Sequence, residues 1–199
     1  MRTMLRWGAA AYFVTGVLSA AIAWLWRSGS PLEHPEPWLV LPAETRHVYS
    51  FLLGTTFGAL VAVLTRVAVQ HFKWAQKLHR EFRPIARSLT AVGILVLALF
   101  SAIGEELLFR GLLQPFLGLW LSAALFGFVH QMPGPSRWVW VTWATAVGLA
   151  LGLIFQLTGS LVGCIAAHAL INAVNLIYLK SHDPEPQRRA LGGLLGQRG

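Results

Sequence analysis

Long apolar runs constrain this chain more than any other feature. A helix that crosses a bilayer needs about 20 mostly apolar residues, and the chain has six candidate segments for such helices. They occupy residues 7–26, 48–69, a run beginning at 88, about 120–130, 138–157 and 161–179. Charged residues make up 12% of the sequence, against about 25% in soluble domains. The sequence predicts an all-α fold, a polytopic membrane helical bundle of about six transmembrane helices.

A chain of 199 residues has room for one integrated membrane domain. We expect residues 1–87 to supply two transmembrane helices and a basic cytoplasmic loop, residues 88–179 a helical core, and residues 180–199 a flexible basic tail. The first segment carries Trp24, Trp26 and Arg27 where a signal peptide would have small cleavage-site residues. It is therefore expected to be a retained helix.

The basic residues predict the orientation of the chain. Residues 70–87 carry five Lys or Arg against one Glu, and the tail is also basic, whereas residues 27–47 have more acidic than basic side chains. Basic loops stay in the cytoplasm, so both termini and the segment 70–87 are expected there. The formal net charge of +8 then indicates membrane lipids, through anionic headgroups, and not nucleic acid, as the partner.

Few charged residues interrupt the second half of the chain. Between residues 88 and 179 they are Glu105, Glu106, Arg110 and Arg137. An ionisable residue inside a membrane is costly and indicates a functional site. Glu106 and Arg110 have the i, i+4 spacing of a helical ion pair, so we assign them to structure and orientation. Glu105 has no such partner, and we assign it to chemistry.

Three further polar residues lie in the later apolar segments. His130 ends the fourth segment, and His168 lies in the sixth with Asn172 four residues later on the same helix face. For each of these residues taken alone, a role in helix packing is the alternative. Buried polar groups in lipid must meet one another or water, however, so we expect Glu105, His130, His168 and Asn172 to converge.

Such a set suits hydrolysis of an amide. A carboxylate beside an imidazole can activate water as a general base, and a His/Asn pair can stabilise an oxyanion. Alternatively, Glu105, His130 and His168 could hold a divalent metal such as zinc, which leaves open whether a cofactor is needed. There is no H-E-x-x-H motif, and Asp183 is the only aspartate, so zincin and paired-aspartate sites are not supported. The G-x-S-x pattern at residues 134–137 is a weak serine-protease signal.

Three motifs occur in order on successive apolar segments. Residues 105–110 read E-E-x-x-x-R, residues 126–130 read F-x-x-x-H, and residues 168–172 read H-x-x-x-N. In this order and spacing the chain resembles the CPBP family of intramembrane proteases, the CAAX proteases and bacteriocin-processing enzymes, also called Abi. Among bacterial members it is similar to the myxosortase-like enzymes. The resemblance covers residues 88–179.

The resemblance implies an intramembrane endopeptidase in a bacterial inner membrane, acting on a protein or peptide with a membrane-proximal segment. By analogy, Glu105 and His130 would activate water, and His168 and Asn172 would stabilise the oxyanion, by a glutamate-dependent or a metal-dependent mechanism. A catalytically silent scaffold or immunity-type protein of the same fold is the alternative. The sequence indicates neither the substrate nor the oligomeric state.

The depth of the site follows from helix lengths, with one discordant residue. Glu105 and His130 each lie about 12 positions, roughly 18 Å, from a turn near Pro115 and Gly118, so an antiparallel pair of helices would bring them together. His168 joins them only if residues 131–136 dip into the protein or a helix bends. Counted from the basic segment, Glu105 falls in the outer half of the membrane, which predicts access from the extracytoplasmic side.

Overall fold

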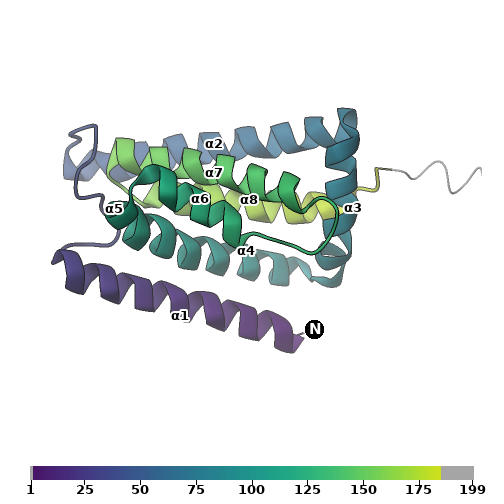
Figure 1. The fold of residues 1–199 in the computed structure, drawn as a ribbon, viewed down its shortest axis with the longest axis horizontal. Helices are drawn as coiled ribbons and strands as arrows, with labels where there is room; N and C mark the ends of the chain where they lie inside the picture. Colours follow the sequence, from purple (N-terminus) through teal and green to yellow (C-terminus); the bar gives the residue numbers. More distant parts are fainter. Residues whose placement is uncertain (1, 185–199) are drawn as a thin grey trace, which may run out of the picture.

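The computed structural model describes residues 2–184, and this part of the chain is helical throughout apart from its connections. The elements in chain order are α1 (Arg2–Arg27), α2 (Ala43–His71), α3 (Lys73–Ser88), α4 (Ala91–Glu106), the π-helix η1 (Leu107–Leu113), α5 (Gln114–Leu117), α6 (Leu119–Val129), α7 (Arg137–Thr158) and α8 (Val162–Ser181). The long helices run along one common direction as a bundle (Figure 1). The predicted all-α membrane bundle is confirmed.

Within residues 2–184, five helical runs are long and apolar enough to cross a membrane, where the sequence predicted about six. They are Trp7–Arg27, Ala43–His71, Ala91–Leu117, Arg137–Thr158 and Val162–Ser181. The exception is α6, whose 11 residues extend only about 16 Å, roughly half of a ~30 Å bilayer core. Beyond α6, residues 130–136 continue toward α3 as a non-helical segment (Figure 1). The fourth pass is therefore half helix and half loop.

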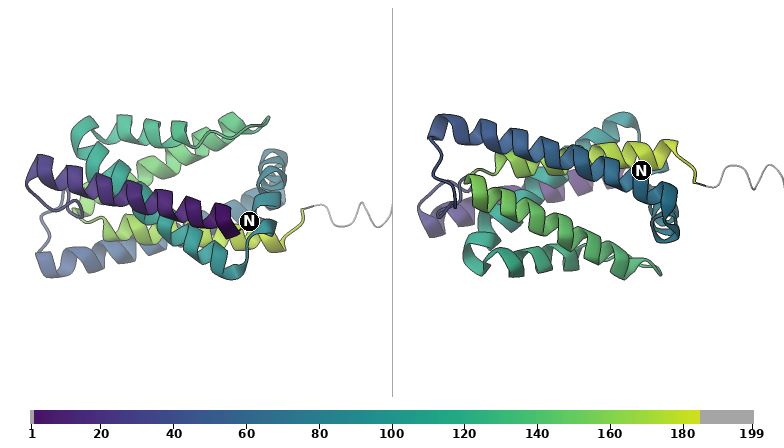
Figure 2. Two further views of the ribbon diagram at one scale, coloured as in Figure 1. Left: turned by 90° about the horizontal axis from the view of Figure 1, so that it is seen from below. Right: turned by 90° about the horizontal axis from the view of Figure 1, so that it is seen from above.

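The segment predicted as a basic loop is instead the helix α3, which lies across the ends of the other helices (Figures 1 and 2). Its sequence is amphipathic: Ala75, His79 and Ala86 are buried, while Lys73 and Lys77 are exposed. A helix with one apolar and one basic face lies in the membrane interface. A loop and a helix with this composition carry the same charge, so composition alone did not distinguish the two structures.

Contacts with the end of α8 hold α3 in place. The Arg83 guanidinium lies 2.9 Å from the Asp183 carboxylate, and His79 Nε2 lies 3.0 Å from the carbonyl oxygen of His182. Burial lowers the pKa of the His79 imidazole, which keeps it neutral near pH 7. Residues 180 and 181, expected in the tail, belong to α8, and residues 182–184 follow it without helix. The remaining residues of that prediction, 185–199, lie outside the described residues.

Glycines allow two pairs of helices to approach closely. A Cβ atom on Gly54 of α2 would collide with the backbone of Gly163 in α8, and one on Gly104 of α4 would lie 2.5 Å from the carbonyl oxygen of Tyr12 in α1. Small residues at such contacts are how membrane helices pack without a hydrophobic driving force. The second contact places Tyr12 beside the residue that follows Gly104, which is Glu105.

The connections and chain segments outside the long helices lie at two opposite ends of the bundle. The start of α1, helix α3, residues 130–136 and the end of α8 share one end, and the α1–α2 and α7–α8 connections lie at the other (Figures 1 and 2). The segments expected in the cytoplasm thus lie together.

Between α7 and α8 the buried core includes Leu151, Phe155 and Leu161.

Candidate active site

Glu106 and Arg110 form the ion pair expected from their spacing. Arg110 Nη1 donates to Glu106 Oε1 at 2.9 Å, and Arg110 Nη2 donates to the carbonyl oxygen of Gly148 at 2.7 Å. Both side chains are buried, and the guanidinium lies 4.3 Å from the ring centre of Phe126. Burying either charge without its partner would cost several kcal/mol of stability, and the ion pair removes most of that cost.

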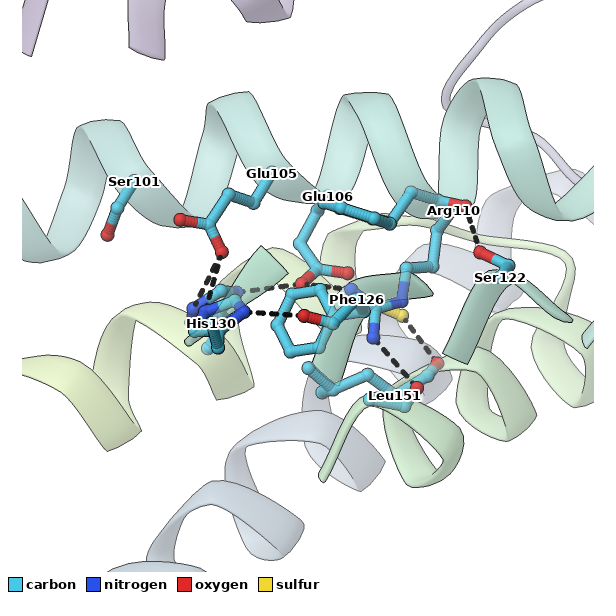
Figure 3. A network of polar contacts seen from close by, with 12 residues as sticks. Ser101, Glu105, Glu106, Arg110, Ser122, Phe126, His130 and Leu151 are labelled. Carbon is cyan, nitrogen blue, oxygen red and sulfur yellow. Dashed lines mark hydrogen bonds and ion pairs between the residues drawn. The ribbon is translucent and has the colours of Figure 1, made fainter. Parts of the chain in front are cut away.

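The π-helix η1 begins directly after the two glutamates. The Phe109 carbonyl oxygen in this turn accepts the backbone N–H of Gln114 and also a hydrogen bond from Ser122 Oγ of α6 at 2.8 Å (Figure 3). π-helical turns are rare and often occur at functional sites. Here the turn joins the helix that carries the glutamates to the helix that carries His130.

His168 contacts both glutamates from α8. Its Nδ1 lies 2.7 Å from Glu106 Oε1, so Nδ1–H donates to the carboxylate and fixes the ring. Its Nε2 then lies 3.9 Å from Glu105 Oε2. Glu106 therefore serves Arg110, as the sequence predicted, and also orients His168, which the sequence did not predict.

His130 stands at the end of α6, within reach of Glu105 (Figure 3). Its Nδ1–H donates to the carbonyl oxygen of Phe126 at 2.6 Å, and its Nε2 faces Glu105 Oε2 at 3.4 Å. The short α6 and the non-helical segment 131–136 remove the discordance in depth. Ser136, the residue of the weak serine-protease pattern, holds that segment to α3 by donating to Glu81 Oε1 at 2.8 Å.

Asn172 lies one turn after His168 on α8. Its Nδ2 donates to Ser101 Oγ of α4 at 3.1 Å. An amide nitrogen carries two hydrogens, so one remains for another acceptor. Ser101 had no predicted role, although it precedes Glu105 by four residues and therefore lies on the same helix face.

One cavity of about 320 Å³ joins the predicted chemical residues. Its lining includes Glu105, His130, His168 and Asn172, whereas Glu106 and Arg110 are not among the lining residues. The structure thus brings together the four residues predicted for chemistry and leaves the two predicted for structure outside the cavity wall.

Besides Ser101, sequence reasoning missed two further residues of this site. Tyr12 of α1 lines the cavity together with Glu105, and its side chain lies near enough to interact electrostatically with the Glu105 carboxylate. The Phe126 ring packs against Arg110, His130 at 4.4 Å and His168 at 5.9 Å between ring centres. Phe126 had a signal, since it begins the F-x-x-x-H motif, but a single tyrosine in an apolar helix has none.

Glu105, His130 and His168 are also the residues of the metal alternative. Within residues 2–184, no group of three or more His, Cys, Asp or Glu side chains is arranged to hold a metal ion. The steps proposed below are derived from the protein's own groups.

Comparison with known proteins places the site in a family. Residues 87–174 match the family described as type II CAAX prenyl endopeptidase Rce1-like. This segment is Rce1-like. It contains all six residues predicted for the site, and the resemblance drawn from the three motifs is confirmed.

A curated relative supports the same placement. The Rce1-like segment shares 40% identity over 81 residues with the uncharacterized protein YpbD of Bacillus subtilis strain 168, a member of this family. The match covers 41% of this chain and 42% of YpbD, so each protein has more than half of its length outside it. No solved structure matches the chain.

Proposed function

We propose that this protein is an intramembrane endopeptidase that hydrolyses a peptide bond near a membrane-embedded or lipid-proximal segment. The observation that carries the proposal is the convergence of Glu105, His130, His168 and Asn172 on one cavity inside an apolar bundle. Polar groups at this depth are costly. The Rce1-like segment supports the same class of reaction.

Glu105 and His130 are the groups that activate water. Glu105 Oε2 and His130 Nε2 lie 3.4 Å apart, and both can accept a hydrogen bond when His130 carries its proton on Nδ1. A water held by both directs a lone pair at the scissile carbonyl carbon. Glu105 takes the water's proton as the C–O bond forms, and returns it to the leaving nitrogen as the C–N bond breaks.

His168 and Asn172 are the donors for the oxyanion. Asn172 offers its second N–H. His168, whose Nδ1–H donates to Glu106, offers Nε2–H only when the ring carries both protons. Fixed donors aimed at developing negative charge are worth most in such a water-poor site.

Removal of one oxyanion donor tests this role. We expect Asn172→Ala to lower kcat by roughly 10²–10³-fold with little change in KM, because the donor acts mainly in the transition state. The assay uses purified protein in nanodiscs and a library of apolar ten-residue peptides read by mass spectrometry. Thr65→Val is the control, because Thr65 also lines the cavity but bonds its own helix. An unchanged kcat would contradict the role.

The position of the cavity supports a side of access different from the one predicted from residue counts. The cavity lining continues from Glu105 to Trp74, Phe82 and Ile85 of α3, and includes no residue from the α1–α2 connection. Residue counts gave the depth of Glu105 but not the direction in which the cavity extends. We propose that substrates enter beside α3, which the positive-inside rule places at the cytoplasmic face.

Labelling tests the side of access in a Cys164→Ala background. A cysteine at Ile85, which is exposed and lines the cavity, should react with an impermeant thiol reagent in inside-out vesicles and block hydrolysis. The same reagent should leave activity intact when added outside whole cells. A cysteine at Val40, exposed on the α1–α2 connection, should show the opposite labelling pattern. Inhibition from outside would place access at the extracytoplasmic face.

A further inference from the structure

The cavity continues past the four proposed catalytic residues. Beyond Asn172 its wall includes Asn175, Leu176, Tyr178 and Leu179 of α8. Asn175 follows His168 by seven residues and Asn172 by three, so the three polar side chains share one helix face. Asn175 and Tyr178 also lie outside the Rce1-like segment, which ends at residue 174.

Two polar atoms on this wall lack hydrogen-bond partners. Within residues 2–184, neither the buried Oδ1 of Asn175 nor the buried hydroxyl of Tyr178 has one. Native proteins satisfy nearly all such groups, so these two indicate a bound partner. The Tyr178 ring is held by His182, stacked at 4.7 Å, and by Arg66 at 5.3 Å, which fixes the position of the hydroxyl.

The other walls of this part of the cavity are mostly apolar, with His79 beside Tyr178 as a polar exception. Trp74 and Phe82 come from α3, and Trp140 and Trp143 from α7, with Phe82 and Trp140 packed edge to face at 4.8 Å. A ligand here would meet hydrogen-bonding groups on α8 and mostly apolar surface elsewhere. An extended peptide has this character, because its backbone needs partners when buried and its side chains can be apolar.

We propose that Asn175 and Tyr178 form a subsite that binds the backbone of an extended apolar peptide running from Glu105 toward α3. From His168 to Tyr178 the helix rises about 15 Å, and an extended chain covers about 3.3–3.6 Å per residue. The subsite therefore holds about four residues on one side of the scissile bond. This inference rests on the proposed function, for which it names the substrate segment.

A binding cycle tests the subsite without relying on catalysis. The probes are a fluorescein-labelled apolar tetrapeptide and its analogue in which backbone amides are replaced by esters. Binding is measured by fluorescence polarisation to the Glu105→Gln protein in nanodiscs. We expect the amide peptide to bind about tenfold more tightly than the ester, the effect of losing hydrogen bonds to the backbone.

Variants then locate the hydrogen bonds. Asn175→Leu and Tyr178→Phe, each in the Glu105→Gln background, should reduce the amide preference to less than about threefold. Tyr49→Phe is the matched control, because Tyr49 lies exposed on α2, and should retain the preference. Melting temperatures identify any misfolded variant, and Tyr178→Phe removes only one hydroxyl. An amide preference that is unchanged in both variants, or absent in the parent, overturns the subsite.

Hydrolysis assays distinguish failure of the subsite proposal from failure of the proposed endopeptidase function. With Glu105 intact, Asn175→Leu should raise KM about tenfold at unchanged kcat for long peptides. Hydrolysis with wild-type KM in that variant overturns the subsite and leaves the endopeptidase proposal standing. A wild-type protein that cleaves no peptide overturns the endopeptidase proposal, and the binding cycle still decides the subsite.

Discussion

Glu105→Gln should nearly abolish peptide hydrolysis, with a loss of up to about 10⁴-fold. Glutamine keeps the shape of the side chain and can still contact Tyr12 and His130, but it cannot accept the proton of the attacking water. The rate is measured with purified protein in nanodiscs and apolar peptides. We expect His130→Ala and His168→Ala to be similarly inactive while remaining folded and inserted.

The control for Glu105→Gln is the same change at Glu44, an exposed residue in the first turn of α2, which should retain wild-type activity. If Glu105→Gln were fully active, Glu105 would not be the general base. If neither it nor the wild type cleaved any peptide, the alternative of a catalytically silent scaffold or immunity-type protein would be favoured.

Arg110→Met should destabilise the protein by about 3–5 kcal/mol, the cost of leaving one charge of a buried pair without its partner. Arg110 Nη1 lies 2.9 Å from Glu106, and the side chains are 1% and 0% exposed, so solvent cannot replace the lost contact. The free energy of unfolding is measured by thermal and denaturant unfolding in detergent. Activity should also fall, because Glu106 orients His168.

Two further variants isolate the pair. Adding Glu106→Gln to Arg110→Met should recover part of the stability, since no uncompensated charge remains. Arg46→Met breaks the more exposed pair with Glu33 and should change stability by at most about 1 kcal/mol. A melting temperature that Arg110→Met leaves unchanged would contradict the structural role of the pair.

Helix spacing and the cost of polarity in lipid predicted much of the site. The ion pair of Glu106 with Arg110 follows from the helical period, and the meeting of Glu105 with His130 and His168 follows from the need of buried polar groups for one another. These are local or pairwise arguments. They held because each residue's face on its helix is fixed by the period of the helix.

Other features of the fold and the site depend on the three-dimensional surroundings of a residue, and no sequence motif indicates them. The contact of Tyr12 with Glu105 requires the close packing of α1 on Gly104, which no motif marks. Helix α3 differs from a basic loop only in the period of its apolar positions. The side of access depends on which walls meet around Glu105, and a count of residues along one helix gives depth alone.

The cavity draws its walls from residues 12 to 179, although the Rce1-like segment spans only residues 87–174. The groups proposed for the reaction come from that segment, while α1, α2, α3 and the end of α8 supply further parts of the wall. In the proposed function, the reacting groups are thus encoded in the central stretch of the gene, whereas the walls that a substrate contacts are encoded along most of its length. Relatives that share only the central stretch can differ in the remaining walls, so a substrate cannot be transferred between them on core identity alone.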